Sequence, residues 1–234
     1  MRPASRTLEV IHDEVTKCTR CPRLVAWREH AATDPPAAHA TEHYWARPLP
    51  GFGDPAASLV LVGLAPAAQG GNRTGRMFTG DRSGDFLFAA LYRAGYANQP
   101  LSCSIDDGLE LSGAWVTAAV RCAPPANKPT PLERDTCADY LAAELDLLNG
   151  AKVLLALGAF AYEALWRLPE IGKGTGGKRP RFAHGLEVPL LASAAAHPRT
   201  LLCTYHPSQR NVFTGLLNGE MFDKVLSRAR ELSA

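Results

Sequence analysis

Three segments of this chain combine glycine or proline with side chains that can bind a ligand or assist hydrolysis. GLAPAAQGGNRTGR (63–76) follows the apolar run SLVLV (58–62), and the other two segments are RCAPPANKP (121–129) and YHPSQRN (205–211). A glycine-rich turn after a buried strand often holds a phosphate or a nucleotide. Its glycines match neither the dinucleotide fingerprint nor the phosphate-binding loop, so this turn alone does not define its ligand.

Four of the six cysteines have the sequence context of metal ligands. Cys18 and Cys21 form a C-x-x-C turn. Cys122 and Cys137 are separated by fourteen residues. Four such thiolates can hold zinc or an iron–sulfur cluster, and the wide spacing of the second pair favours a cluster without deciding the question. A redox-active C-x-x-C pair is the alternative, whereas Cys203 lies in an apolar run and is expected to be a core residue.

Strands and helices alternate along most of the chain. Apolar runs predict strands over 58–66, 115–124, the first part of 152–168 and the first part of 199–211. Helical patterns occupy 5–17, 83–96, 130–148, the part of 152–168 after Gly158, and 219–232. Ser83 is the expected N-cap of the second of these helices. Thr130 and Glu133 predict a capping box at the start of the third.

This alternation predicts parallel βαβ units and therefore an α/β fold with helices on both faces of the sheet. Ligands of such sheets bind beyond the carboxyl ends of the strands. The segments beginning at 63, 121 and 205 all follow predicted strands. We therefore expect them to line one crevice.

Length and composition indicate a single domain over residues 1–234, because 234 residues with 46% hydrophobic content can bury one sizeable core. No apolar run reaches the roughly 18 residues of a membrane helix, and the charged N-terminus has no signal-peptide pattern, so a cytoplasmic protein without membrane contact is expected. The net charge is only +2. Basic residues nevertheless gather in two loops, at 73–82 and at 172–182, which favours a polyanionic partner.

The sequence resembles the family 5 uracil-DNA glycosylases. The resemblance rests on YWARPLPGFGDP (44–55), GLAPAAQGGNRTGRMFTGD (63–81), RCAPPANKPTP (121–131) and YHPSQRN (205–211), in that order. It implies a three-layer α/β/α sandwich with a four-stranded parallel sheet. It also implies hydrolysis of the N-glycosidic bond of uracil, hypoxanthine and xanthine in double-stranded DNA, with no obligate protein partner evident.

The resemblance further implies a [4Fe–4S] cluster on Cys18, Cys21, Cys122 and Cys137, through which segment 1–30 packs on the domain. A base must leave the duplex to be cleaved, and the crevice is the natural pocket for it. His206 is expected to stabilise the departing base, Asn127 to read its edge or hold water, and Asp81 to orient the water. The expected substrate-binding residues are Gly63, Ala65, Pro66, Ala67, Ala68, Gln69, Gly70, Gly71, Asn72 and Phe78. The expected DNA-binding residues are Arg73, Arg76, Lys128, Lys178, Arg179, Pro207, Ser208, Gln209 and Arg210.

One position departs from the family pattern, because Gln69 stands where the family usually has histidine. Glutamine keeps hydrogen-bonding capacity but cannot become cationic, so activity or base range can differ from that of relatives. Two other functions fit part of the sequence. An iron–sulfur electron carrier or redox sensor would explain the cysteines but not the three polar loops, and a nucleotide hydrolase would need the Lys-Ser/Thr pair that the glycine-rich loop lacks.

Overall fold

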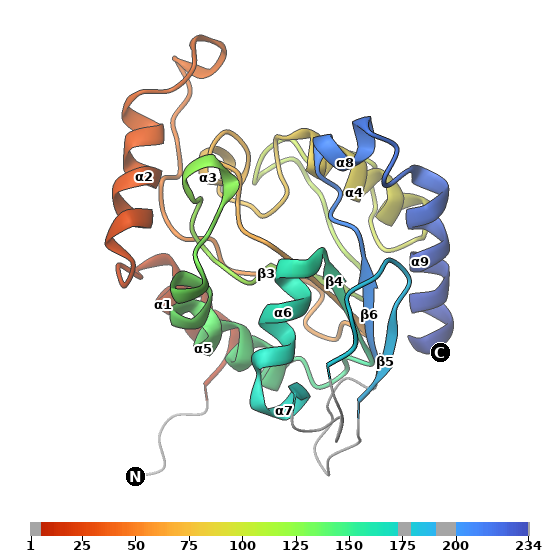
Figure 1. Ribbon diagram of the computed structural model, residues 1–234. Coiled ribbons are helices and arrows are strands. Elements are labelled where there is room, and N and C mark those ends of the chain that lie inside the picture. Colours follow the sequence, from red (N-terminus) through yellow and green to blue (C-terminus); the bar gives the residue numbers. More distant parts are fainter. Residues whose placement is uncertain (1–5, 173–178, 191–199, 234) are drawn as a thin grey trace.

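A mixed sheet runs through the middle of the computed structural model, which describes residues 6–172, 179–190 and 200–233 (Figure 1). Its strands are β1 (Phe52–Gly53), β2 (Leu59–Gly63), β3 (Ala114–Ala118), β4 (Val153–Leu157), β5 (Glu187–Pro189) and β6 (Thr200–Thr204). Their order across the sheet is β1-β3-β2-β4-β6-β5. The four inner strands are parallel, as predicted, whereas β1 and β5 pair antiparallel at the two edges.

The expected four-stranded sheet is therefore six-stranded, and the sequence does not predict the two edge strands. β1 has two residues and β5 has three, which is too few for a hydrophobic period to stand out. In β5, only Val188 is buried, and Pro189 can be accommodated because β5 is an edge strand.

Helices cover both faces of the sheet, which confirms the predicted sandwich. They are α1 (Leu8–Thr16), α2 (Pro22–Thr33), α3 (Gly71–Thr74), α4 (Arg82–Arg93), α5 (Pro131–Leu147), α6 (Ala159–Arg167), α7 (Pro169–Gly172), α8 (Gln209–Phe213) and α9 (Gly219–Ser233). Short 3-10 turns lie at η1 (Ala37–His39) and η2 (Pro125–Asn127). None of the helices in the described part of the chain has the length and apolar composition needed to cross a membrane.

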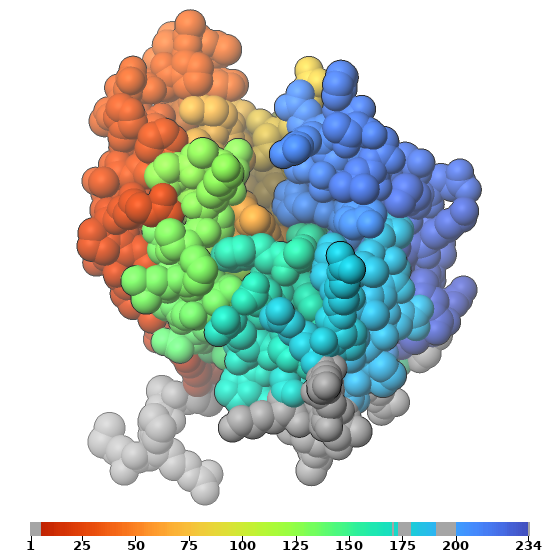
Figure 2. Space-filling model, viewed as in Figure 1, coloured from red at the N-terminus to blue at the C-terminus, as the bar shows by residue number. Residues whose placement is uncertain are grey.

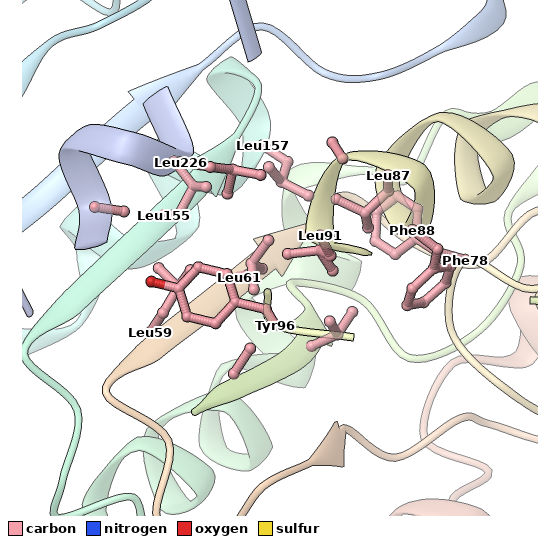
Figure 3. Close-up of a cluster of buried hydrophobic side chains, with 14 of the residues drawn as sticks. Leu59, Leu61, Phe78, Leu87, Phe88, Leu91, Tyr96, Leu155, Leu157 and Leu226 are labelled. Carbon is pink, nitrogen blue, oxygen red and sulfur yellow. The ribbon is translucent and has the colours of Figure 1, made fainter. Parts of the chain in front are cut away.

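Alternate residues of the inner strands enter two separate cores. Leu59 and Leu61 of β2 pack with side chains of α4 and α9, as Figure 3 shows for Leu87, Leu91 and Leu226. The intervening residues of β2, Val60 and Val62, pack on the other face with α5 and α6. Every residue of β2, β3 and β4 is buried, and these residues are apolar apart from Thr117, as expected of strands that are covered on both faces.

N-terminal caps define where helices α4 and α5 begin. The capping box at the start of α5 is present, with Thr130 and Glu133 bonding each other's backbone amides at 3.2 and 2.8 Å. Ser83 is not the N-cap of α4: Asp81 caps it instead, accepting hydrogen bonds from the amides of Ser83 and Gly84. A carboxylate favours the positive end of the helix dipole, which explains the difference.

Helix α2 is another element that the sequence does not predict. Its buried face consists of Leu24, Arg28 and Ala31, so a charged residue stands where the apolar period requires a hydrophobic one. Cys21 is its N-cap and Pro22 occupies the first turn. The C-x-x-C turn therefore joins two helices, α1 and α2.

Candidate active site

The carboxyl ends of β2, β3 and β6 meet around a cavity of about 110 Å³. The loops after these strands form its walls, so the predicted convergence of the three polar segments is confirmed. Figure 2 shows this end of the molecule hollowed between the orange N-terminal segment and the blue segment that carries α8. The lining residues are Leu64, Ala65, Pro66, Ala67, Met77, Phe78, Asp81, Ser83, Asn127, His206 and Ser208.

His206 enters the cavity from the end of β6. Its backbone carbonyl accepts a hydrogen bond of 2.9 Å from the Asn211 side chain, and a Cβ at Gly158 would lie 3.1 Å from its own Cβ. Its ring nitrogens have no hydrogen-bond partner among the described residues. Burial lowers the pKa of His206 to about 4, so the imidazole is neutral at neutral pH. A neutral ring with one N–H can donate a hydrogen bond to a ligand in the cavity.

Phe78 packs beside this imidazole, with ring centroids 6.0 Å apart and an interplanar angle of 30°. Its ring covers Gly63, where a Cβ would lie 2.7 Å from ring carbons. Its backbone has a φ of +54°, an uncommon conformation for a bulky residue. This backbone conformation of Phe78 requires glycine at position 84, because a Cβ there would lie 1.8 Å from the Phe78 carbonyl oxygen.

Asp81 is the N-cap of α4 and also lines the cavity. Oδ1 accepts hydrogen bonds of 2.9 and 3.0 Å from the amides of Ser83 and Gly84. Oδ2 lies against Gly70, where a Cβ would be only 2.1 Å away. Burial raises the pKa of Asp81, and the two amide hydrogen bonds oppose the rise. One oxygen of the carboxyl group is therefore held by the helix amides, and the residue as a whole lines the cavity.

Asn127 reaches the cavity from the 3-10 turn after β3. Asn127 and Ala126 both adopt the left-handed conformation, with φ of 54° and 52°. Asparagine tolerates this conformation better than alanine does, so strain is concentrated at Ala126. Lys128 is exposed beside them, and its carbonyl accepts a hydrogen bond of 3.2 Å from Arg23. The turn thus carries the Asn127 amide and, at the next position, the exposed side chain of Lys128.

The small residues predicted to bind substrate fall into two groups. Ala65, Pro66 and Ala67 line the cavity, whereas Ala68 is half-buried and does not. Gly63, Gly70 and Gly71 lie behind it, and a Cβ at each would come within 3 Å of Phe78, Asp81 and Leu49, respectively. Their bare backbones therefore let the loop pack closely around the residues that do line the cavity.

Gln69 and Asn72 bond to neighbouring elements of the protein. Tyr44, itself buried, donates a hydrogen bond to Oε1 of Gln69. Asn72 is fully buried and donates a hydrogen bond of 3.1 Å to the carbonyl of Arg28 in α2. No sequence motif singles out Tyr44 or Arg28. Their contacts with the loop become visible only in the folded chain.

Arg73 and Arg76 do not present free guanidinium groups to DNA as predicted. Arg76 is 7% exposed and forms an ion pair of 2.7 Å with Asp107. Arg73 is 12% exposed, pairs with Glu42 and donates to the carbonyls of Gln69 and Gly80. These arginines hold the loop together from inside, a role that sequence cannot separate from phosphate contact.

The remaining predicted DNA-binding residues lie mostly near the cavity mouth. Pro207 is buried, Ser208 caps α8, and Gln209 and Arg210 are exposed. Arg179 is exposed, with a guanidinium nitrogen 3.9 Å from Glu163, and Lys178 lies outside the described residues. Phe213, which no sequence motif singles out, is 89% exposed at the end of α8. Its exposure is a tertiary property that no periodicity reveals.

The four predicted ligand cysteines come together around a second, small cavity. Cys18 and Cys21 reach it from the turn between α1 and α2, Cys122 from the loop after β3, and Cys137 from α5. All four are free thiols. In the described parts of the chain, no group of three or more His, Cys, Asp or Glu side chains is arranged to hold a single metal ion. Four thiols around one cavity are the donor set that a [4Fe–4S] cluster takes, with one thiolate for each iron. Cys203 is fully buried in the core, as predicted.

Comparison with known proteins defines the class. The sequence model described as the uracil DNA glycosylase superfamily matches residues 50–230, and the chain therefore belongs to this superfamily. A Type-5 uracil-DNA glycosylase of Mycobacterium leprae is 46% identical over 95% of this chain and 94% of its own length. Another, of Thermus thermophilus, is 48% identical over 96% and 98%. A Type-4 uracil-DNA glycosylase of Thermotoga maritima is 29% identical over 66% and 63%. The predicted resemblance to type 5 is confirmed.

Proposed function

We propose that this chain removes uracil from double-stranded DNA by hydrolysing the N-glycosidic bond, which leaves an abasic site. The observation that carries the proposal is the cavity at the carboxyl ends of the strands, where Asp81, Asn127 and His206 meet from three separate loops. The target nucleotide must leave the duplex to reach such a cavity, which costs least for a mismatched base such as uracil opposite guanine. We expect this reaction to take place in the cytoplasm.

The reaction separates charge, and His206 is suited to the negative side. As the bond between the sugar carbon and the base nitrogen breaks, the base departs with the electron pair. The neutral imidazole donates a hydrogen bond to the base carbonyl on which this charge develops. Phe78, packed against the same ring, stacks on the base.

Asp81 and Asn127 act on the water side of the reaction. The carboxyl group of Asp81 orients a water molecule. As the water oxygen bonds to the sugar carbon, the water releases a proton, which finally protonates the departing base. The sugar resembles an oxocarbenium ion at this point and needs little help from a base, so a carboxylate capping a helix is sufficient. The Asn127 amide reads the edge of the base or holds the same water.

The DNA duplex lies across the cavity mouth in this proposal. Lys128, Arg179 and Arg210 supply exposed positive charge for its phosphates. Gln209 and Phe213 of α8 face the strand, and the aromatic ring fills the space left by the flipped nucleotide.

The cysteine cavity is proposed to hold a [4Fe–4S] cluster on Cys18, Cys21, Cys122 and Cys137. When bound, the cluster supplies four iron–thiolate bonds that tie the turn between α1 and α2 to the loop after β3 and to α5. Residues 1–30 would thereby be fixed to a single domain of 234 residues. Because the loop after β3 also carries Asn127, the same bonds would steady the cavity wall.

Hypoxanthine and xanthine are proposed as further bases, because the resemblance to the family 5 uracil-DNA glycosylases implies them. The first loop offers only Ala67 and Ala68 at the place where the resemblance leads us to expect a side chain that positions water, which leaves that role to Asp81 or Asn127. Gln69 is proposed to modulate this range. Tyr44 occupies its amide oxygen and leaves the amide nitrogen as a donor.

The test uses a labelled duplex with one uracil opposite guanine, treated with alkali after incubation to break the strand at abasic sites. Strand breakage at the uracil is expected, and parallel duplexes carry hypoxanthine or xanthine. The variants Asp81→Asn and Asn127→Ala should retain DNA binding and lose excision. Absence of excision by protein that contains a full cluster would contradict the proposal, and Gln69→His would then show whether this position is the cause.

A further inference from the structure

Buried arginines provide the starting point for an inference about the cysteine cavity. Four arginines in the described part of the chain are less than a tenth exposed. Three of them pair with carboxylates: Arg76 with Asp107, Arg121 with Glu144 and Arg134 with Asp135. The fourth, Arg28, is 5% exposed and forms no ion pair with any described residue.

The guanidinium of Arg28 points into the cysteine cavity. One terminal nitrogen donates hydrogen bonds of 3.2 Å to the carbonyl oxygen of Cys18 and 3.3 Å to Sγ of Cys122. Its Nε is fully buried and has no hydrogen-bond partner among the residues that the structure describes. Arg28 lines the same cavity as the four cysteines. A permanently charged group is therefore enclosed with sulfur as its neighbour.

Burial of an unpaired charge is strongly unfavourable, and folded proteins compensate such charges with a counter-ion or a metal site. Arg28 also occupies a position on the buried face of α2 where an apolar residue is expected. Its position therefore costs both the burial of a charge and the loss of an apolar contact. Neutral thiols cannot offset it. A [4Fe–4S] cluster with four thiolate ligands carries a net negative charge and can.

We propose that Arg28 is the buried counter-ion of the iron–sulfur cluster and that its hydrogen bond to the Cys122 sulfur sets the reduction potential and retention of that cluster. The inference rests on the cluster in the proposed function. Net charge and hydrogen bonds to sulfur are main determinants of cluster potential. A cation favours the reduced, more negative cluster, so its removal shifts the midpoint potential to more negative values.

The experiment compares cluster-loaded parent protein with Arg28→Gln and Arg28→Lys by iron and sulfide content, redox titration and the rate of iron loss to a chelator. Arg28→Gln should shift the midpoint potential negatively and lose iron several-fold faster. Arg28→Lys keeps the charge and should remain much closer to the parent. Arg93→Gln is the control, because it removes an arginine of α4 that is 48% exposed and paired with Asp223 and that does not line the cysteine cavity, and it should change neither quantity appreciably.

The outcomes separate the two levels of the proposal. Parent protein without iron and sulfide would overturn the cluster itself. A parent with a full cluster and an Arg28→Gln potential equal to the parent's would overturn the role of Arg28 alone. Arg28→Gln could fail to hold a cluster at all. In that case, a cluster retained by Arg28→Lys would support the role of Arg28 as counter-ion, whereas equal loss of the cluster in both variants would contradict that role.

Discussion

His206 is the residue at which burial and chemistry are most closely linked. Its ring nitrogens have no hydrogen-bond partner among the described residues, and the ring lines the cavity. We expect His206→Ala to lower the single-turnover rate of uracil excision by about 10²–10³, as the loss of one donor to a developing oxyanion typically does. The rate is measured by quenched incubation with the uracil–guanine duplex. A rate close to the parent's, with DNA binding unchanged, would remove His206 from this role.

The same burial predicts a dependence of stability on pH. The folded protein keeps His206 neutral down to about pH 4, whereas an unfolded histidine takes up a proton near 6.5. Between these values the unfolded state binds more protons, so stability should fall as pH is lowered from 6.5 to 4. Thermal unfolding of the parent and of His206→Ala across this range provides the measurement. The variant should lose less stability, and identical curves would show that His206 is not desolvated.

At the scale of the element, α8 follows Ser208, which lines the cavity, and it presents the ring of Phe213 to solvent. Phe213 is 89% exposed, so Phe213→Ala should leave the folded state unaffected. If the ring stacks in the duplex, DNA affinity should fall by about 1–3 kcal/mol, the usual contribution of one stacked base. Fluorescence anisotropy with uracil-containing DNA measures this. Tyr92→Ala is the control, because Tyr92 is another exposed aromatic residue, 48% exposed near the C-terminal end of α4. An equal loss of DNA affinity in both variants would contradict the stacking role of Phe213.

For the molecule as a whole, the Arg121–Glu144 pair joins distant parts of the chain. Arg121 is 1% and Glu144 2% exposed, and their nitrogen and oxygen atoms approach to 2.6 and 2.9 Å. Glu144 also accepts hydrogen bonds from Thr117 of β3 and from the amide of Gly51. The loop before β1, the sheet and α5 thus share one carboxylate.

Removal of that carboxylate leaves a buried guanidinium without compensation. Glu144→Ala should lower the free energy of unfolding by about 3–5 kcal/mol, measured by chemical denaturation. The control is Glu220→Ala, which removes an exposed pair with Lys224 and should cost less than about 1 kcal/mol. Equal effects of the two variants would show that the buried pair does not join these segments.

Much of the fold and of the site follows from local sequence. The buried strands are unbroken apolar runs, and the capping box of α5 is a contact between residues three apart, so both can be recognised without the tertiary structure. The parallel order then places Asp81, Asn127 and His206 at one edge of the sheet. Edge strand β5 and helix α2 escape notice because three residues carry no period and because Arg28 interrupts the apolar face.

By itself, the sequence determines the strand–helix alternation, the four thiols and the loops that carry the chemistry, since these depend on residue type and short spacing. Tertiary structure alone decides the partner of each charge. Arg73 and Arg76 look like phosphate ligands in the sequence, yet in the folded chain they form ion pairs with Glu42 and Asp107, respectively. Arg28 resembles an ordinary helical arginine, yet it is buried among sulfur atoms. The cost of a buried charge depends on neighbours distant in sequence, and only the folded chain brings them together.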